Sequence, residues 1–268
     1  MSNNTALQLI AQVTREDIPG FRLFVDYEAL RSLTHAERVA MVYIADGNSK
    51  LGDRLPNISF TPGNDLIYLA ATQRHASNVV GTCGEFCGAC FNGGCYAVNE
   101  VRAFRNTDKR YAMNAAILAV DPDAIRDAMI MYCAKWYNNP RARKERKPFF
   151  RLNESGELTP ELLCVYIEVC DAVPGVTFYG YTKATTLYHE HRDAIPANMH
   201  FVASQWNNSV PNPDGLAQFV YNDGSDPAVM AMPACPAVDE RGNATGKTCQ
   251  DCLWCAVANH GARMVYAH

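Results

Sequence analysis

The chain has 268 residues, 11 of them cysteine, and a net charge of −4 from 24 Lys and Arg against 28 Asp and Glu. A chain of this length can bury a sizeable core without covalent cross-links, which excludes a small disulfide-stabilised scaffold. With 48% hydrophobic and 19% charged residues, the composition is that of a globular protein. The slightly acidic balance gives no argument for nucleic acid or an anionic membrane as a partner.

The first half of the chain mixes helix and strand patterns. We expect helices at Ala6–Val13, Asn99–Met113 and from Asp121-Pro122 to Tyr137, and β-rich segments at Arg38–Ala45 and Asp65–Thr72. The Asp-Pro pair predicts a helix N-cap followed by proline at the first helical position.

The second half alternates strands with helices. Strands are predicted at Pro148–Leu152, Gly175–Tyr181, Met199–Ser204 and Gln218–Tyr221, and helices at Thr159–Ala172 and Ala184–Arg192. This alternation predicts an α/β fold, either a partial (β/α) barrel or an open, mostly parallel sheet. We expect one α/β domain at residues 1–230, with a cysteine-rich segment at 231–268 packed on it.

No stretch reaches the ~20 apolar residues that a membrane span requires. The N-terminal stretch also lacks the basic start and apolar run of a signal peptide. We therefore expect a cytoplasmic protein that makes no contact with a membrane. In such a reducing compartment, closely spaced cysteines are more often metal ligands or redox groups than disulfides.

The cysteines fall into two groups of four and three single residues. The first group is Cys83, Cys87, Cys90 and Cys95, the second is Cys235, Cys249, Cys252 and Cys255, and the others are Cys133, Cys164 and Cys170. The single cysteines lie in segments of helical character, so we expect them to be small buried hydrophobic residues.

The first group has the residue types and the spacing of a metal-binding loop. Its spacing is C-x3-C-x2-C with Cys95 shortly after, and its many glycines allow the backbone to wrap tightly. This favours a 4Fe–4S cluster, because zinc ribbons prefer two separated C-x2-C pairs. Zinc is the alternative metal for this loop. If Cys95 also binds the cluster, all four irons have a protein ligand, and if it does not, one iron keeps an open coordination position.

The second group contains C-x2-C-x2-C at residues 249–255, the opening of the bacterial ferredoxin run. Cys235-Pro236 supplies the Cys-Pro pair upstream, and Trp254 is suited to shielding a cluster from water. We predict a second iron–sulfur site with zinc as the alternative. A joint site that uses cysteines of both groups is a further alternative.

The x3/x2 spacing resembles that of radical S-adenosylmethionine (SAM) enzymes, in which three cysteines hold a 4Fe–4S cluster with one open iron. The chain departs from that pattern at Ala89, where the family usually has an aromatic residue. The resemblance implies that Ser155-Gly156-Glu157 binds the cofactor. Polar residues after the strands would line the pocket as catalytic groups, namely Asn153, Glu157, Lys183 and Gln205.

Four stretches resemble the bacteriophage "gene product 88" family. They are TCGEFCGACFNGGCYA, FFRLNESGEL, VPGVTFYGYTKA and the terminal CPA…GKTCQDCLWC, and they span Asn57 to Cys255 in family order. The chain has Ser155-Gly156-Glu157 where the family tends to have Ser-Gly-Asp. The resemblance implies a phage protein of the host cytoplasm with a distantly radical-SAM-like, TIM-barrel-like fold, and no known reaction.

We therefore expect a phage iron–sulfur protein with one or two 4Fe–4S clusters, acting as a radical-SAM-like enzyme or a redox protein. Its substrate would be a small molecule or a host macromolecule. The alternative is a non-catalytic binding module, stabilised by zinc or a closed cluster, that acts on host protein or nucleic acid. The sequence leaves the oligomeric state open.

Overall fold

The computed structural model describes residues 22–23, 25–63, 76–79, 81–86, 95–139, 148–206, 210–222, 224–241, 243–257 and 261–266. The predicted helix at Ala6–Val13, the predicted strand at Asp65–Thr72, and Cys87 and Cys90 of the first cysteine group lie outside these residues. No helix in these ranges is both long enough and apolar enough to span a bilayer.

The chain divides into two compact units. The first comprises Met1–Ile44, Ser59–Met131 and Ser155–Val169, and the second comprises Ala45–Ile58, Tyr132–Glu154 and Cys170–His268. The second cysteine group belongs wholly to the second unit, whereas Cys83 and Cys95 belong to the first. Residues 231–268 are part of the second unit, and the predicted boundary at residue 230 stays a prediction.

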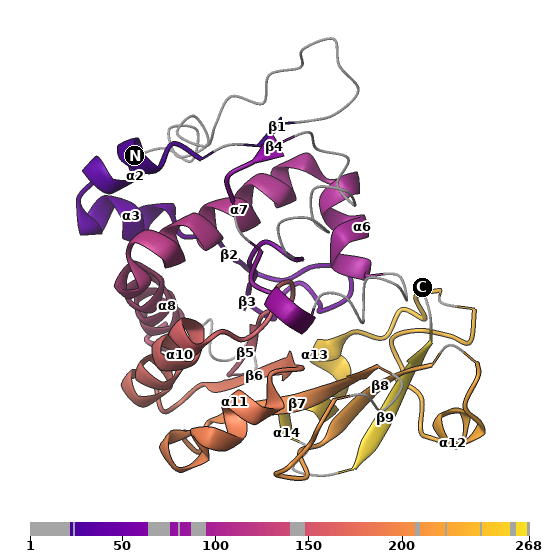
Figure 1. Cartoon of the computed structure of the whole chain (residues 1–268). Coiled ribbons are helices and arrows are strands. Elements are labelled where there is room, and N and C mark those ends of the chain that lie inside the picture. The colour runs from indigo at the N-terminus through magenta and orange to yellow at the C-terminus, as the bar shows by residue number, and fades with distance from the viewer. Residues whose placement is uncertain are drawn as a thin grey trace. The chain divides into compact units, whose positions relative to one another are not determined.

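The first unit is mainly helical. It contains α2 (Tyr27–Ser32), α3 (His35–Met41), η1 (Gly84–Phe86), α6 (Tyr96–Ala103), α7 (Arg105–Val120) and a parallel pair of strands, β1 (Arg22–Leu23) and β4 (Ala76–Ser77). Helix α7 packs against α2 and α6 (Figure 1). Residues 111–118 of α7 are all buried, so this helix is covered on every side and forms the centre of the unit.

Two sequence predictions in the first unit need correction. The first half of Arg38–Ala45 is helical, because a capping box between Thr34 and Glu37 starts α3, and only Ile44–Ala45 forms a strand, β2. The backbone N–H of Thr34 donates to Glu37 Oε2 at 2.8 Å. The single helix predicted at Asn99–Met113 is two helices, since Phe104 takes an extended backbone conformation (φ −121°, ψ 91°) between α6 and α7.

The second unit is organised by an open sheet of seven strands in the order β2-β3-β5-β6-β7-β8-β9. The strands after β2 are β3 (Asn57–Ile58), β5 (Phe149–Leu152), β6 (Thr177–Thr182), β7 (Met199–Trp206), β8 (Gln218–Asn222) and β9 (Ala262–Tyr266). Every pairing from β3 to β9 is parallel. The predicted α/β class with an open, mostly parallel sheet is confirmed.

Two predicted helix starts are correct. In α8 (Pro122–Tyr137), Asp121 Oδ1 accepts a hydrogen bond from the backbone N–H of Ala124 at 3.2 Å. In α10 (Pro160–Ala172), Thr159 Oγ1 accepts from the N–H of Leu162 at 3.2 Å. Both helices begin with proline, whose missing N–H has no intrahelical partner to lose at that position.

The solvent exposure of the three single cysteines depends on the helix face that each one occupies. Cys133 of α8 and Cys170 of α10 are fully buried, as expected. Cys164 is exposed, which corrects the expectation for this residue. It lies on the face of α10 opposite the buried residues Leu162 and Tyr166, where helical periodicity directs it away from the core.

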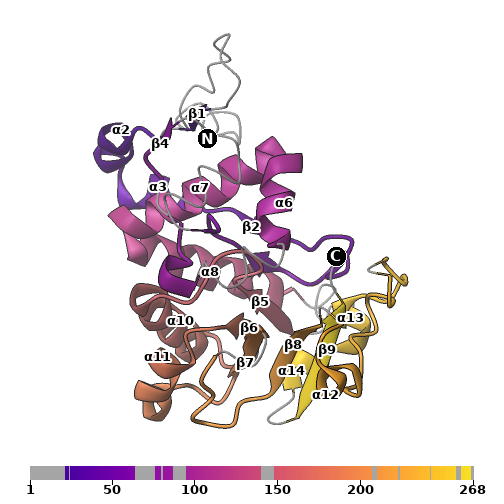
Figure 2. The same cartoon turned by 45° about the vertical axis from the view of Figure 1, so that its right-hand side comes forward.

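The C-terminal part of the second unit adds short helices to the sheet. They are α11 (Thr185–Glu190), η2 (Arg192–Ala194), α12 (Pro227–Met230), α13 (Cys249–Cys252) and α14 (Trp254–Val257). Helix α14 packs on β6 and β7, and α12 packs on β8. Figure 2 shows α12, α13 and α14 grouped beside β8 and β9, and β9 adds a further parallel strand to the sheet.

Candidate metal centre

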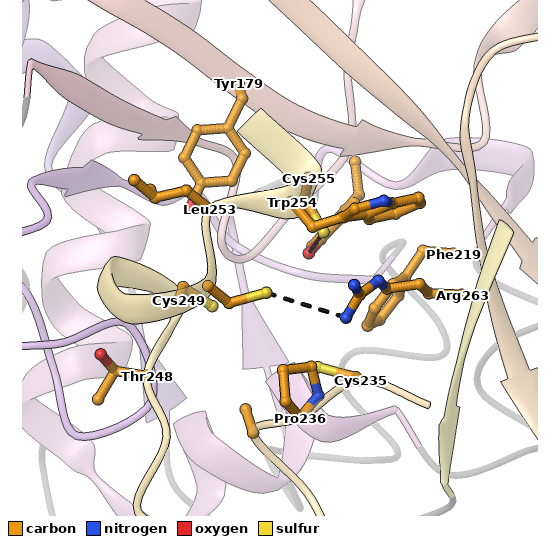
Figure 3. A pocket seen from close by; sticks show the side chains of 13 residues that line it. Tyr179, Phe219, Cys235, Pro236, Thr248, Cys249, Leu253, Trp254, Cys255 and Arg263 are labelled. Atoms are coloured by element: carbon orange, nitrogen blue, oxygen red, sulfur yellow. Dashed lines mark hydrogen bonds between the residues drawn. The ribbon is translucent and has the colours of Figure 1, made fainter. Parts of the chain in front are cut away.

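The four C-terminal cysteines line one pocket of the second unit (Figure 3). Each is partly buried, and none forms a disulfide. The cysteines are Cys235, Cys249, Cys252 and Cys255, and the aromatic residues of the same pocket are Tyr179, Tyr181, Phe219 and Trp254. The pocket therefore contains the whole ligand set that the spacing predicts for this group.

The C-x2-C-x2-C run forms two short helices with a sharp bend between them. Leu253 separates α13 from α14 and has a left-handed backbone conformation with φ of 52°. Residues with a Cβ rarely adopt this conformation, because it brings the Cβ close to the following carbonyl oxygen. The bend ends α13 after Cys252 and places Cys255 at the start of α14, with both thiols on the same pocket.

Backbone hydrogen bonds bring the distant parts of the pocket together. The N–H of Cys249 donates to the carbonyl of Lys50 at 3.1 Å, and the N–H of Gln250 donates to that of Leu51 at 2.9 Å. The N–H of Cys235 donates to the carbonyl of Met264 in β9 at 2.7 Å. These bonds fix both ends of the cysteine set to other elements of the unit.

Tyr181 of β6 is a hydrogen-bond donor to one of the thiols. Its hydroxyl lies 2.9 Å from Cys255 Sγ. Its ring stacks on that of Phe219 in β8, with 4.8 Å between the centroids and 16° between the planes. Burial raises the pKa of the Tyr181 hydroxyl well above its usual value, and the nearby Cys255 raises it further. The hydroxyl therefore keeps its proton and acts as a donor.

Arg151 of β5 is a buried cation beside this tyrosine, with 3% of its surface exposed. Its guanidinium lies 3.8 Å from the ring centroid of Tyr181 and 5.5 Å from that of Tyr179. Arg151 pairs with Tyr179 in the parallel ladder, so all three side chains leave the sheet on the same face. The arrangement is a cation–π contact in a largely desolvated place.

The surroundings of Cys249 and Cys255 have opposing effects on the pKa of their thiols. Burial raises the pKa of Cys249, and it raises that of Cys255 to about 11. The Tyr181 hydrogen bond lowers the pKa of Cys255, and the charge of Arg151 lowers the pKa of both thiols. Without a metal these two groups are protonated near neutral pH, while their neighbours favour the thiolate form that a metal binds.

A second arginine, Arg263, contacts the cysteine set directly. Arg263 of β9 places Nη1 3.9 Å from Cys252 Sγ, the contact drawn as a dashed line in Figure 3. Its guanidinium also lies 5.1 Å from the ring of Trp254. One arginine, Arg263, and one tyrosine hydroxyl, that of Tyr181, therefore contact sulfur atoms of this pocket.

Whether this pocket binds an iron–sulfur cluster or a zinc ion stays a prediction. Within the described part of the chain, no three His, Cys, Asp or Glu side chains gather as ligands of one metal ion. A zinc site requires four ligands at ~2.0–2.3 Å from one point. A cluster spreads its thiolates over several irons, and donors to the sulfurs stabilise its charge.

The first cysteine group is described only at its two ends. Cys83 and Cys95 are partly buried, and Cys95 precedes α6 as its N-cap residue. The N–H of Cys83 donates to the carbonyl of Gly63 at 3.1 Å. The predicted ligands Cys87 and Cys90 lie outside the described residues, so the ligand set of this loop stays a prediction.

The turn Ser155-Gly156-Glu157 lies next to the start of that loop, within the first unit. The N–H of Glu157 donates to Thr82 Oγ1 at 3.0 Å, and Thr82 directly precedes Cys83. A carbonyl of this turn, that of Ser155, accepts from the N–H of Phe60 at 3.0 Å. Gly156 has a φ of 90°, and the turn approaches Thr82 so closely that a Cβ has no room there.

The other predicted pocket residues follow strands of the second unit. Asn153 comes directly after β5 and is 3% exposed, with a φ of 44°. Lys183 follows β6 and is partly buried. Gln205 of β7 uses its amide on the loop that follows, donating to the carbonyl of Val210 at 2.9 Å. Their predicted catalytic roles stay predictions.

Sequence reasoning missed three contributors to the C-terminal pocket, namely Arg151, Tyr181 and Arg263. One signal was present for Arg151, a charged residue inside the otherwise apolar strand Phe149–Leu152. Tyr181 alternates with Tyr179 along β6, which places both on one face of the strand. The strand that carries Arg263 was not predicted, so its position beside Cys252 had no signal.

Together, fold and site define an α/β protein with an open, mostly parallel sheet and a pocket lined by four cysteines. Residues 41–258 match the family described as Gene product 88. The chain therefore belongs to the bacteriophage gene product 88 family, and the match includes both cysteine groups. Neither the curated proteins nor the solved structures contain a match.

Proposed function

We propose that this protein is a phage iron–sulfur protein whose C-terminal pocket holds a cluster through Cys235, Cys249, Cys252 and Cys255. The observation that carries the proposal is the placement of four thiols around one pocket, with donors from Tyr181 and Arg263 next to their sulfurs. With four protein ligands, a 4Fe–4S cluster has no open iron and supplies one-electron transfer. The chain's own residues would bind it, exclude water and adjust its charge.

The test is anaerobic reconstitution of the full chain with iron and sulfide, followed by metal and sulfide analysis. We expect brown protein with absorption near ~400 nm, the signature of thiolate-bound iron. The double variant Cys249→Ser/Cys252→Ser should lose the C-terminal cluster. The matched control is Cys164→Ser, because this cysteine is exposed on α10 and far from both cysteine groups in sequence. A colourless protein that contains only zinc would contradict the proposal and favour the zinc alternative.

A second candidate is radical-SAM-like chemistry at the first cysteine loop, within a partial (β/α) barrel. The contact of Ser155-Gly156-Glu157 with Thr82 favours it, because the proposed cofactor-binding turn then adjoins Cys83. The sequential strand order of the sheet is also the topology that such a barrel requires. In this second proposal, the groups that act on substrate are Asn153, Glu157, Lys183 and Gln205. The substrate would be a small molecule or a host macromolecule in the host cytoplasm.

Reconstituted protein supplied with SAM and a reductant tests the second candidate. Formation of 5′-deoxyadenosine, lost in Cys83→Ser, would support it. A fully loaded protein that neither binds SAM nor forms this product would exclude it. The remaining alternative would then be a closed, non-catalytic binding module.

A further inference from the structure

The C-terminal pocket contains charged and polar groups that cluster binding alone does not require. Four thiolates are sufficient to hold a 4Fe–4S cluster. The pocket adds a tyrosine hydroxyl on Cys255 and a buried arginine beneath that tyrosine. A buried arginine keeps its positive charge, so it stabilises negative charge that develops nearby.

Arg151 places a buried positive charge against the ring of Tyr181. Its charge acts on both Cys249 and Cys255, and its guanidinium covers the Tyr181 ring from 3.8 Å. The Phe219 ring stacks on Tyr181 with 4.8 Å between centroids. Tyr181 is therefore held in place by two neighbours, with its hydroxyl directed to one sulfur.

A hydrogen bond to a cluster sulfur stabilises the reduced form more than the oxidised form, because the reduced cluster carries one more negative charge. The same holds for a nearby buried cation. Both effects make the cluster easier to reduce. They act strongly here because the low-dielectric surroundings screen charge poorly.

We propose that the Tyr181 hydroxyl, positioned by Arg151 and Phe219, donates a hydrogen bond to the Cys255 thiolate of the loaded protein and thereby raises the reduction potential of the cluster. This inference rests on the proposed function, since it needs a cluster at this site. Reduction adds one electron from an external one-electron donor to the cluster. No bond of Tyr181 breaks, and its proton stays on the hydroxyl.

The strand offers a matched control for the hydroxyl. Tyr179 lies two residues earlier on the same face of β6, is 2% exposed, and also lies beside Arg151. Its hydroxyl makes no hydrogen bond to any cysteine in the described ranges. Tyr179→Phe and Tyr181→Phe therefore remove the same atom from neighbouring positions, and only the second removes a bond to sulfur.

The experiment is a redox titration of reconstituted wild type, Tyr181→Phe and Tyr179→Phe, with dithionite as reductant and the EPR signal of the reduced cluster as readout. We expect a more negative midpoint potential for Tyr181→Phe and a wild-type potential for Tyr179→Phe. Equal potentials in wild type and Tyr181→Phe would overturn the inference while leaving the proposed function intact. A wild-type protein without a cluster at this site would instead overturn the proposed function.

If Tyr181→Phe fails to fold, the wild-type protein and Tyr179→Phe decide the question. Resonance Raman spectra of the cluster in H2O and D2O report hydrogen bonds to thiolate sulfur. We expect the iron–thiolate stretching bands to shift in D2O for wild type and for Tyr179→Phe. Bands that do not shift would overturn the inference.

Discussion

Gly156 is a position at which a single methyl group has a large effect. Its φ of 90° strains any residue with a Cβ, and an added Cβ would lie 2.4 Å from Thr82 Oγ1 and 3.2 Å from the Cβ of Phe60. We expect Gly156→Ala to lower the free energy of unfolding by about 2–3 kcal/mol, from backbone strain and from displacing Thr82. Guanidinium denaturation measures the change.

Gly224 is the matched control, because its φ of 82° is similar and no atom lies within 4 Å of its added Cβ. Gly224→Ala should lower the free energy of unfolding by about 1–2 kcal/mol, from backbone strain alone. If the two variants lose the same free energy of unfolding, the close approach of Gly156 to Thr82 has no energetic effect. That result would remove the main structural support for an ordered turn beside Cys83.

The cysteines and the turn at 155–157 could be found from residue type and spacing, because thiols and glycines have few other uses in such patterns. Arg151 and Tyr181 could not be assigned to the site from sequence. Their roles depend on the pairing of β5 with β6, which sets which side chains share a face. The register of a parallel sheet is a property of tertiary structure and leaves no local pattern in either strand.

At the scale of elements, an ionic cluster joins α3 to the start of α8 in the first unit. His35 Nδ1 lies 2.9 Å from Asp121 Oδ2, and its Nε2 lies 2.9 Å from Asp127 Oδ2. Hydrogen bonds to Asp127 and then to Asp121 raise the pKa of His35 above its ordinary value. A ring that donates from both nitrogens must be protonated, so the contact is complete only in the charged form.

We expect the stability of the first unit to fall as pH rises through the folded-state pKa of His35. A raised pKa stabilises the folded state fully below about pH 6.5, the ordinary value for His, and the contribution disappears above the folded value. Melting temperatures between about pH 5.5 and pH 8.5 measure this, and His35→Gln should flatten the profile across that range.

His191→Gln is the control, since this exposed ring contacts the backbone carbonyl of Leu187 and no carboxylate in the described residues. The profile of His191→Gln should match that of wild type. If His35→Gln keeps the wild-type slope, the contacts of His35 with Asp121 and Asp127 do not contribute to the pH dependence.

Elements with strong local signals were predicted, and those that depend on tertiary contacts were not. The caps at Asp121 and Thr159 placed two helix starts correctly, because side-chain capping is a local interaction. The apolar run at Arg38–Ala45 favoured a strand, yet the capping box before it starts a helix. Strand β9 was missed because it is a short segment of five residues at the end of a loop-rich, cysteine-rich stretch, and its pairing with β8 is a tertiary contact.

At the scale of the whole molecule, the two cysteine groups are divided between two compact units. Cys83 and Cys95 belong to the first unit, and all four C-terminal cysteines belong to the second. Each group is also ordered by contacts within its own unit, through Gly63 for Cys83 and through Lys50 and Met264 for the second group. Two independent sites and one joint site are therefore the two alternatives to separate, and we propose two independent sites.

Independent sites predict additive loading. Reconstituted wild type should hold about eight iron atoms per chain, and the variants Cys83→Ser/Cys95→Ser and Cys249→Ser/Cys252→Ser should each hold about four, as expected for two 4Fe–4S clusters. Hydrogen exchange should show protection of α13, α14 and β9 on loading, retained in the first variant and lost in the second. About four irons in wild type and none in either variant would instead establish a joint site. Because the backbone partners of Cys83, Cys249 and Cys235 lie in the same unit as each cysteine, we expect the additive result.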